Sequence, residues 1–344
     1  PGFVDLNTSL EMAAFRGVVA DKPFSEWLQS MISLSSKMDS SDWYDSAILG
    51  GLDALSSGIT TVAGITPGNA VVKAVNELGL RGVIYREVGA MDKKRVKHAV
   101  KAAENDIERW QAKVDEDLVT IGIAPAAIFA NHPEVFKEAS KLAAEKNLPL
   151  AIRLAGSREE YNFVMYGSSM FAVDKLNEEI RGYVEIPPWL PFGVTPVKYA
   201  LNWGVFDAPN VMVMHAVHVN DEDIKILRKC DASICACPYS HSKLGMGVAP
   251  FSEFMQAGFR VGLGTDSPAA TDLPDMFGEM RAVLLMNRAL NTRHFLDSAT
   301  MLEVATIGGA RALKMDDKIG SLEIGKQADI VAVDLSSTNQ SIEL

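Results

Sequence analysis

The chain has 344 residues, of which 48% are hydrophobic and 22% charged, and it carries a formal net charge of −11. This length suits one large barrel domain or two ordinary domains. The acidic balance excludes a nucleic-acid-binding surface, which requires a basic face, and no apolar run reaches the roughly 18 residues that a membrane span needs. We therefore expect a soluble protein whose partners are small molecules or other proteins.

Short apolar or β-branched runs alternate with longer helical patterns along nearly the whole chain, which predicts a parallel sheet covered by helices. Strands are expected at residues 2–7, 60–65, 82–88, 118–124, 149–155, 211–217, 232–237 and 261–265. Helices are expected at residues 24–37, 41–56, 93–112, 132–146, 221–229 and 274–289. Eight strand–helix units in about 300 residues favour an α/β fold of the closed (β/α)8 TIM-barrel type over an open doubly wound sheet.

One loop breaks this alternation. Residues 186–194, with the sequence IPPWLPFGV, are rich in proline and aromatic side chains and lie between the fifth and sixth expected strands. A long loop on a barrel is either a lid over a site or a well-packed surface loop. Trp189 and Phe192 are the side chains with which this loop would cover a pocket.

Three cysteines, Cys230, Cys235 and Cys237, fall close together near the seventh strand. A zinc ribbon would need a second pair of Cys or His ligands at suitable spacing, and none follows. We interpret the three as buried free thiols, with Cys235 and Cys237 on opposite faces of the strand. Free thiols favour a reducing compartment, and the first residues lack the pattern of a signal peptide.

The chemistry of a (β/α)8 barrel lies at the carboxyl ends of its strands. The residues expected there are small, polar or charged: Asn7, Ser9, Ala126, Arg153, Gly156, His215, His241 and Asp266. They include imidazoles and a carboxylate, which suit acid–base chemistry or metal binding.

Four segments give these positions a context: MHAVHVNDEDI, CPYSHSKLGMGVAPFSEF, VGLGTDSPAATDLPDMFGEMR and DDKIGSLEIGKQADIVAVD. In these segments the chain resembles the amidohydrolase superfamily, in the group of chlorohydrolases and aminohydrolases that act on triazines, cytosine, S-adenosylhomocysteine and aminodeoxyfutalosine. The resemblance implies a divalent metal held by a His-x-His pair after strand one, a His on strand five and an Asp after strand eight. It also implies a Glu after strand five and a His after strand six that move protons.

Most of these implied positions carry other residues in this chain. The His-x-His pair becomes Asn7 and Ser9, the strand-five metal ligand becomes Arg153, and the proton-moving Glu becomes Gly156. A His that deaminase-type members place after strand four becomes Ala126.

These replacements weaken a metal site for clear reasons. Asn and Ser are weak neutral ligands for a metal that prefers imidazole or thiolate. A guanidinium stays protonated and has no lone pair to donate, so Arg153 would place a positive charge near the cation, or form an ion pair with Asp266. We therefore expect the zinc or iron cofactor of the family to be absent.

His215 and Asp266 match the positions of the strand-six His and the strand-eight Asp, and His241 is a departure from the family pattern. These three side chains form a new metal site, an acid–base trio, or a residual pocket of polar groups bound to water. His218 is interpreted as structural. Glu87 is expected to form an ion pair with Arg153 or Arg86.

Two functions remain open at this stage. In the main interpretation the chain is a pseudoenzyme whose barrel serves as a structural, assembly or ligand-binding subunit. Its expected partners are another protein or a second copy of itself, with a small-molecule ligand in the barrel mouth as a further candidate. The alternative is a hydrolase or deaminase of a cyclic amidine or purine- or pyrimidine-type amine that uses a rearranged or metal-free site. The resemblance also divides the chain into a barrel at residues 1–319 and, at residues 320–344, one strand of a small β-sandwich whose N-terminal part does not precede Pro1.

Overall fold

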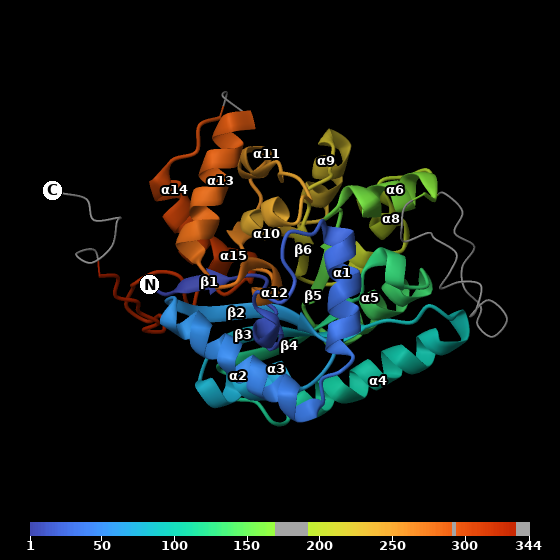
Figure 1. Cartoon of the computed structure of the whole chain (residues 1–344), viewed down its shortest axis with the longest axis horizontal. Coiled ribbons are helices and arrows are strands. Elements are labelled where there is room, and N and C mark those ends of the chain that lie inside the picture. The colour runs from blue at the N-terminus through green and yellow to red at the C-terminus, as the bar shows by residue number, and fades with distance from the viewer. Residues whose placement is uncertain (169–191, 291–293, 335–344) are drawn as a thin grey trace.

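The computed structural model describes residues 1–168, 192–290 and 294–334. Eight parallel strands form one sheet in the order of the chain, and Figure 1 shows helices arranged around them. The strands are β1 (Phe3–Asp5), β2 (Ile59–Thr66), β3 (Arg81–Val88), β4 (Val119–Pro125), β5 (Leu150–Leu154), β6 (Val211–His215), β7 (Ser233–Ala236) and β8 (Val261–Leu263). The (β/α)8 barrel expected from the sequence is confirmed, and the eight strands lie where the pattern placed them.

The helices include all six that the sequence predicts. The longer ones are α1 (Phe24–Ser35), α2 (Ser40–Ser56), α3 (Ala70–Leu78), α4 (Lys93–Gln111), α5 (Glu134–Lys146), α6 (Arg158–Tyr166), α9 (Asp221–Lys229) and α13 (Met276–Leu290). Shorter ones are η1 (Leu10–Phe15), η2 (Ile128–Ala130), α8 (Pro196–Asn202), η4 (Val205–Asp207), α10 (Pro238–Lys243), α11 (Phe251–Gln256), α12 (Pro268–Thr271), α14 (Ser298–Glu303), η5 (Val304–Gly308) and α15 (Gly309–Ala312). Asn220 caps α9 by accepting from the backbone N–H groups of Glu222 and Asp223, which explains why the sequence placed this helix so accurately.

The hydrophobic core lies in two layers, as the alternation of side chains along a strand requires. On β3, Val83 and Tyr85 point into the barrel, whereas Ile84 packs outward against the helices. On β6, Met214 points inward and Val213 outward. The barrel interior is therefore a packed core, and space for a ligand lies above it at the strand ends.

The barrel is closed between β1 and β8 by hydrogen bonds of both backbone and side chains. The N–H of Leu6 donates to the carbonyl of Leu263 at 2.8 Å. The carboxylate of Asp5 accepts from the hydroxyl of Thr265 at 2.5 Å and from the N–H of the same residue at 3.1 Å. Asp5 is fully buried, and this burial raises its pKa to about 7. This polar lock places the residues that follow β1 beside those that follow β8.

The C-terminal tail and the loop before α8 lie outside these helices and strands. The strand expected in the tail is not formed within residues 320–334. The backbone bonds of this segment are isolated ones, from Gly2 to Asp329, from Gln327 to Lys318 and from Lys326 to Glu323, and they form no ladder. Arg81 also forms an ion pair with Asp329. The domain boundary after residue 319 stays a prediction.

Trp189 lies outside the described residues, whereas Phe192 packs on Tyr199 with ring centroids 4.7 Å apart. Among the described residues, no helix has the length and apolar character to cross a membrane.

The polar lock predicts a stability effect at Thr265. Thr265→Val keeps the shape of the side chain but removes the hydroxyl that donates to the buried carboxylate of Asp5. We expect the free energy of unfolding to fall by about 1–3 kcal/mol at neutral pH, measured by urea unfolding. Thr120→Val, on the exposed side of β4, is the matched control and should change the value by less than about 0.5 kcal/mol. Equal effects of the two variants would contradict the lock.

Candidate functional site

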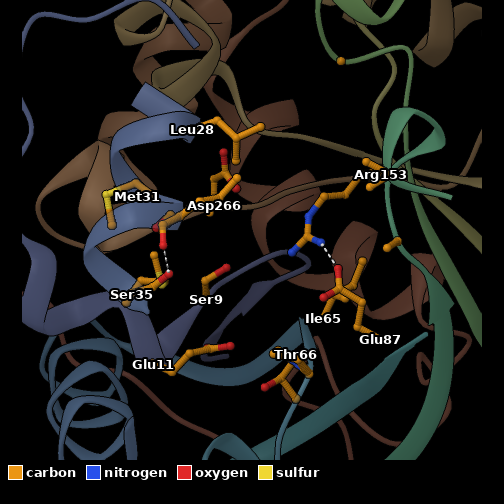
Figure 2. A pocket seen from close by; sticks show the side chains of 18 of the residues that line it. Ser9, Glu11, Leu28, Met31, Ser35, Ile65, Thr66, Glu87, Arg153 and Asp266 are labelled. Carbon is orange, nitrogen blue, oxygen red and sulfur yellow. Dashed lines mark hydrogen bonds and ion pairs between the residues drawn. The ribbon is translucent and has the colours of Figure 1, made fainter. Parts of the chain in front are cut away.

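A cavity of about 700 Å³ opens at the carboxyl ends of the strands. Figure 2 shows side chains from β2, β3, β5 and α1, and from the segments that follow β1 and β8, around this space. Of the residues expected at the site, six line it: Ser9, Ala126, Arg153, Gly156, His215 and Asp266. Asn7 and His241 do not line it, and both are almost fully buried beneath it.

One wall of the cavity is apolar. Trp27, Leu28 and Met31 of α1 face it, together with Trp43 of α2 and Phe129 of η2. The indole N–H of Trp27 donates to the carbonyl of Ala269 at 3.4 Å, which ties α1 to the segment after β8. A wall of this kind suits a flat, partly apolar ligand.

Arg153 projects into the cavity from β5 and pairs with a carboxylate on another strand. Its Nη1 lies 3.1 Å from Oε1 of Glu87, as Figure 2 shows. The expected pair between Glu87 and Arg153 is thus confirmed, and Arg86 instead pairs with Asp106. No bond joins Arg153 to Asp266 among the ion pairs of the described residues. The positive charge is therefore balanced without the strand-eight carboxylate.

Glu11 is a cavity residue that the sequence analysis missed. It lies on η1 just after strand one and is almost completely buried. Burial raises its pKa to about 7, opposed by a hydrogen bond with Thr66 and by the charge of Arg153. No sequence pattern marks this residue, because its burial comes from the way η1 lies against the barrel. At neutral pH it offers both a carboxyl and a carboxylate form to a ligand.

Asn7 and Asp266 meet where the barrel closes. The side-chain amide of Asn7 donates to Oδ1 of Asp266 at 3.3 Å and to the sulfur of Cys237 at 3.4 Å. Its own Oδ1 is buried without a hydrogen-bond partner. Asp266 has a positive φ of 62°, a conformation that a residue other than glycine adopts only where the surroundings impose it.

His215, Cys237 and His241 form a buried group behind the cavity. Nδ1 of His215 lies 3.1 Å from Nε2 of His241, and one donor atom from each of the three residues lies within 4.8 Å of the others. His215 has a φ of 78°, and Nδ1 of His241 is buried without a partner. The expected meeting of His215 with His241 is confirmed. Cys237, which the sequence analysis interpreted only as a buried thiol, is the third member.

The cysteines correct one expectation from the sequence. Cys230, Cys235 and Cys237 are free, but Cys235 and Cys237 do not face opposite sides of the strand. Residues two positions apart on a strand share a face, and the two sulfur atoms lie 3.9 Å apart inside the barrel. The two-residue spacing of Cys235 and Cys237 in the sequence was the signal that could have placed both side chains inside the barrel, and Cys237 near His215.

Both histidines of the buried group are held neutral. Burial lowers the pKa of His215, with the charge of Asp266 opposing and that of Arg153 adding to the effect. Burial also lowers the pKa of His241 well below its ordinary value, and the neighbouring His215 adds to this. Neutral imidazole is the form that binds metals. His218 is separate: its Nε2 bonds to the carbonyl of Met246 at 2.7 Å, which fits its predicted structural role.

The atoms that each group of side chains can offer as ligands show which positions fit a metal. Asn7, Ser9 and Arg153 fit poorly, because a guanidinium offers no lone pair and the two neutral side chains are weak ligands. Two imidazoles and a sulfur fit zinc well. Among the described residues, His215, Cys237 and His241 form the one such group.

Glu160 lies where strand five meets α6 and was also missed by the sequence analysis. Its two carboxyl oxygens accept from the N–H groups of Ala155 at 2.8 Å and Gly156 at 3.1 Å. Burial raises its pKa to about 7. A β-carbon on Gly156 would lie 3.4 Å from the side chain of His215, in van der Waals contact with it. Glu160 thus restores a carboxyl group near the position that Gly156 leaves without one.

Known proteins resemble this chain along its whole length. The model of the "Amidohydrolase family" matches residues 1–343. The chain belongs to the amidohydrolase family. A 5-methylthioadenosine/S-adenosylhomocysteine deaminase of Caldanaerobacter subterraneus subsp. tengcongensis is 31% identical over 98% of this chain and 72% of its own length. A 5'-deoxyadenosine deaminase of Methanococcus vannielii is 27% identical over 97% of this chain and 74% of its own length.

Solved structures of similar fold include an adenosine deaminase of Xanthomonas campestris with bound zinc. Its TM-score is 0.81 at 24% identity, and the match covers 99% of this chain and 73% of that one. An atrazine chlorohydrolase of Arthrobacter aurescens in complex with zinc has a TM-score of 0.76 at 23% identity over 95% of this chain and 74% of that one. At these identities the likeness concerns the fold.

Two expectations from the sequence are contradicted. Amidohydrolase relatives that match nearly all of this chain are named as deaminases, which contradicts the interpretation as a pseudoenzyme serving as a structural, assembly or ligand-binding subunit. The expected absence of a cofactor is contradicted by the zinc in similar amidohydrolases and by the buried group of His215, Cys237 and His241. Both errors arose because the sequence analysis gave most weight to the inherited metal positions: it named His241 as part of a new metal site, but it did not bring Cys237 to the same place.

The raised pKa of Glu160 predicts that the free energy of unfolding depends on pH. Its pKa is about 7 in the folded chain against an ordinary value of 4.5, so its protonated form favours folding. This contribution is complete below the ordinary pKa and is lost as the pH rises through about 7. Urea unfolding at about pH 5 and about pH 8 should show a loss on the order of 3 kcal/mol from this group in the native chain.

Glu160→Gln should remove that part of the pH dependence, whatever its effect on stability at a single pH. Glu145→Gln is the control, because the Glu145 side chain is 60% exposed on α5. The assignment fails if Glu160→Gln and the native chain lose the same stability between the two pH values.

Proposed function

We propose that the chain is a C–N hydrolase that removes the amino group of a cyclic amidine of the purine-nucleoside type. The observation that carries the proposal is the cavity of about 700 Å³ with His215 and Asp266 among its lining residues. This places an imidazole and a carboxylate beside a space large enough for a nucleoside. The deaminase names of the relatives support the same reaction class.

The cavity has complementary surfaces for such a ligand. The apolar wall of Trp27, Met31 and Phe129 can cover the faces of a heterocyclic ring. The carboxyl groups of Glu11 and Glu87 lie in the same cavity and accept hydrogen bonds from ring N–H groups or sugar hydroxyls. The guanidinium of Arg153, held by Glu87, offers its remaining donors to ring nitrogens or oxygens.

The reaction requires water to add to the amidine carbon and a proton to reach the departing nitrogen, so that water and the amine become a carbonyl and ammonia. Nδ1 of His215 is engaged with His241, which leaves Nε2 as the ring nitrogen that can exchange a proton in the cavity. Asp266 is an acceptor that can orient the attacking water. The Nε2–H of His215 can donate to the departing nitrogen, and the carboxylate of Asp266 can accept the proton that the attacking water gives up.

A metal has a place beside this machinery at His215, Cys237 and His241, and a divalent ion of the zinc type supplies a lowered pKa to water that it binds. The side chains of the cavity have separate tasks. The apolar wall excludes bulk water from the ring, and Arg153 and Glu87 orient it. Asp266 and His215 handle the protons.

Ammonia release tests the proposal. Purified protein supplied with zinc is assayed with adenosine, 5'-deoxyadenosine, 5-methylthioadenosine and S-adenosylhomocysteine. We expect at least one to release ammonia and to lose its adenine-type absorbance. Asp266→Asn should lower kcat/KM by about 100-fold or more, because the carboxylate acts in the reaction itself.

Asp316→Asn, at an exposed position after α15, is the control and should leave kcat/KM unchanged. Absence of ammonia release from all four amines by folded protein that carries zinc would overturn the proposal. The same result follows if Asp266→Asn is as active as the native chain.

A further inference from the structure

We infer that the chain binds a thiophilic divalent metal in a displaced site made by Nδ1 of His215, Nε2 of His241 and Sγ of Cys237. The position differs from the one that the resemblance implies, since two of the three ligands come from the segment after β7. The inference deepens the proposed function and rests on it for the part that the metal takes in the reaction. Binding of the metal stands on the geometry alone.

The spacing of the donor atoms is the first argument. Two imidazole nitrogens that share a tetrahedral ion at bond lengths of about 2.0–2.1 Å lie about 3.3 Å apart. The two ring nitrogens here lie 3.1 Å apart, and one ring nitrogen of each histidine lies within 4.8 Å of the sulfur. The three side chains are therefore already gathered to near coordination distance, and they come from two different strand ends.

Unsatisfied polar atoms are the second argument. The described residues contain four buried side-chain atoms without a hydrogen-bond partner, and two of them, Oδ1 of Asn7 and Nδ1 of His241, belong to this group or touch it. Asn7 is 0% exposed and His241 is 1% exposed. Leaving such atoms buried costs free energy. An ion held by Nε2 of His241 would offset this cost at Oδ1 of Asn7, which could turn toward the ion, whereas Nδ1 of His241 is not a ligand of the proposed site.

Asn7 offers a further ligand atom to the same ion. Its amide nitrogen lies 3.4 Å from the sulfur of Cys237. Rotation of the amide by half a turn would exchange this nitrogen for the unpartnered Oδ1, which carries lone pairs, and would give up the bond that the nitrogen donates to Oδ1 of Asp266. A cation beside Cys237 would favour that orientation, because it repels the N–H group and attracts the oxygen.

The residue changes at the barrel mouth are consistent with a metal site that has moved from the family's position to another. The imidazole ligands of the family are missing at Asn7, Ser9 and Arg153, which belong to β1, β5 and the segments after them. Cys237 and His241 supply donor atoms beside His215 that lie outside these positions. Arg153, which would repel a cation in the old position, is held by Glu87.

The donor set selects the kind of metal. A thiolate with two imidazoles favours zinc, cobalt or cadmium over magnesium and calcium, which take oxygen ligands. Coordination would remove the proton of the Cys237 thiol, since the thiolate is the form that binds a metal.

Cobalt substitution tests the site without any need for activity. The chain of residues 1–344 is freed of metal with a chelator and titrated with Co²⁺ at neutral pH. We expect about one Co²⁺ per chain, visible bands of tetrahedral cobalt and a near-ultraviolet band from sulfur-to-cobalt charge transfer. Cys237→Ser should abolish the charge-transfer band and raise the dissociation constant by more than about 100-fold, which exceeds the cost of losing only an outer hydrogen-bond partner.

Two variants make the test specific. Cys235→Ser is the matched control, because its sulfur is equally buried and lies 3.9 Å from that of Cys237, and it should keep the band. His241→Gln should weaken binding but keep the band, which protects the test if Cys237→Ser fails to fold. The inference is overturned if the native chain binds no Co²⁺, if its spectrum lacks the charge-transfer band, or if Cys235→Ser loses the band while Cys237→Ser keeps it.

The outcome separates this inference from the proposed function. A bound ion with the thiolate band but no ammonia release would leave the site established and refute the hydrolase. Ammonia release by protein that binds no metal would leave the hydrolase established and refute the site.

Discussion

The closure of the barrel between β1 and β8 is the constraint on which the site depends. The N–H of Asp266 donates to the carbonyl of Asn7 at 2.7 Å, and below this bond the carboxylate of Asp5 accepts from Thr265. These bonds fix the two segments side by side, so Asn7 must face Asp266. A change of residue type at Asn7 therefore acts directly on the strand-eight carboxylate, and through the contact with Cys237 it also acts on the buried group.

The guanidinium of Arg153 determines how the charges in the cavity are paired. Arg153 is balanced by Glu87 on β3, two strands away in the sheet, which leaves Asp266 free of an ion pair with it. Glu11 is influenced by both members of the pair: the charge of Arg153 lowers its pKa and that of Glu87 raises it, although burial is the larger cause. Arg153, Glu87 and Glu11 thus form a polar side of the cavity, and the apolar wall forms another. A heterocyclic ligand that contacts both would be held in one orientation.

The sequence predicted the fold because alternation of side chains and helix caps are local signals. Asn220 marks the start of α9, and each strand appears as a short apolar run. The sequence also identified Arg153, His215 and Asp266 as residues of the barrel mouth. It missed Glu11 and Glu160, whose pKa values depend on burial that only the folded chain creates. A comparison of inherited positions one by one detects lost ligands, but ligands gained on another strand remain invisible to it.

His215 connects the two parts of the site. One ring nitrogen lies against His241 in the buried group, while the residue also lines the cavity. A single imidazole thus separates the group that can hold a metal from the space that can hold an amine. The residue adopts a φ of 78°, which costs on the order of 1–3 kcal/mol for a side chain of this size. Such a cost is retained where the direction of the ring matters, and here the ring must serve both sides at once.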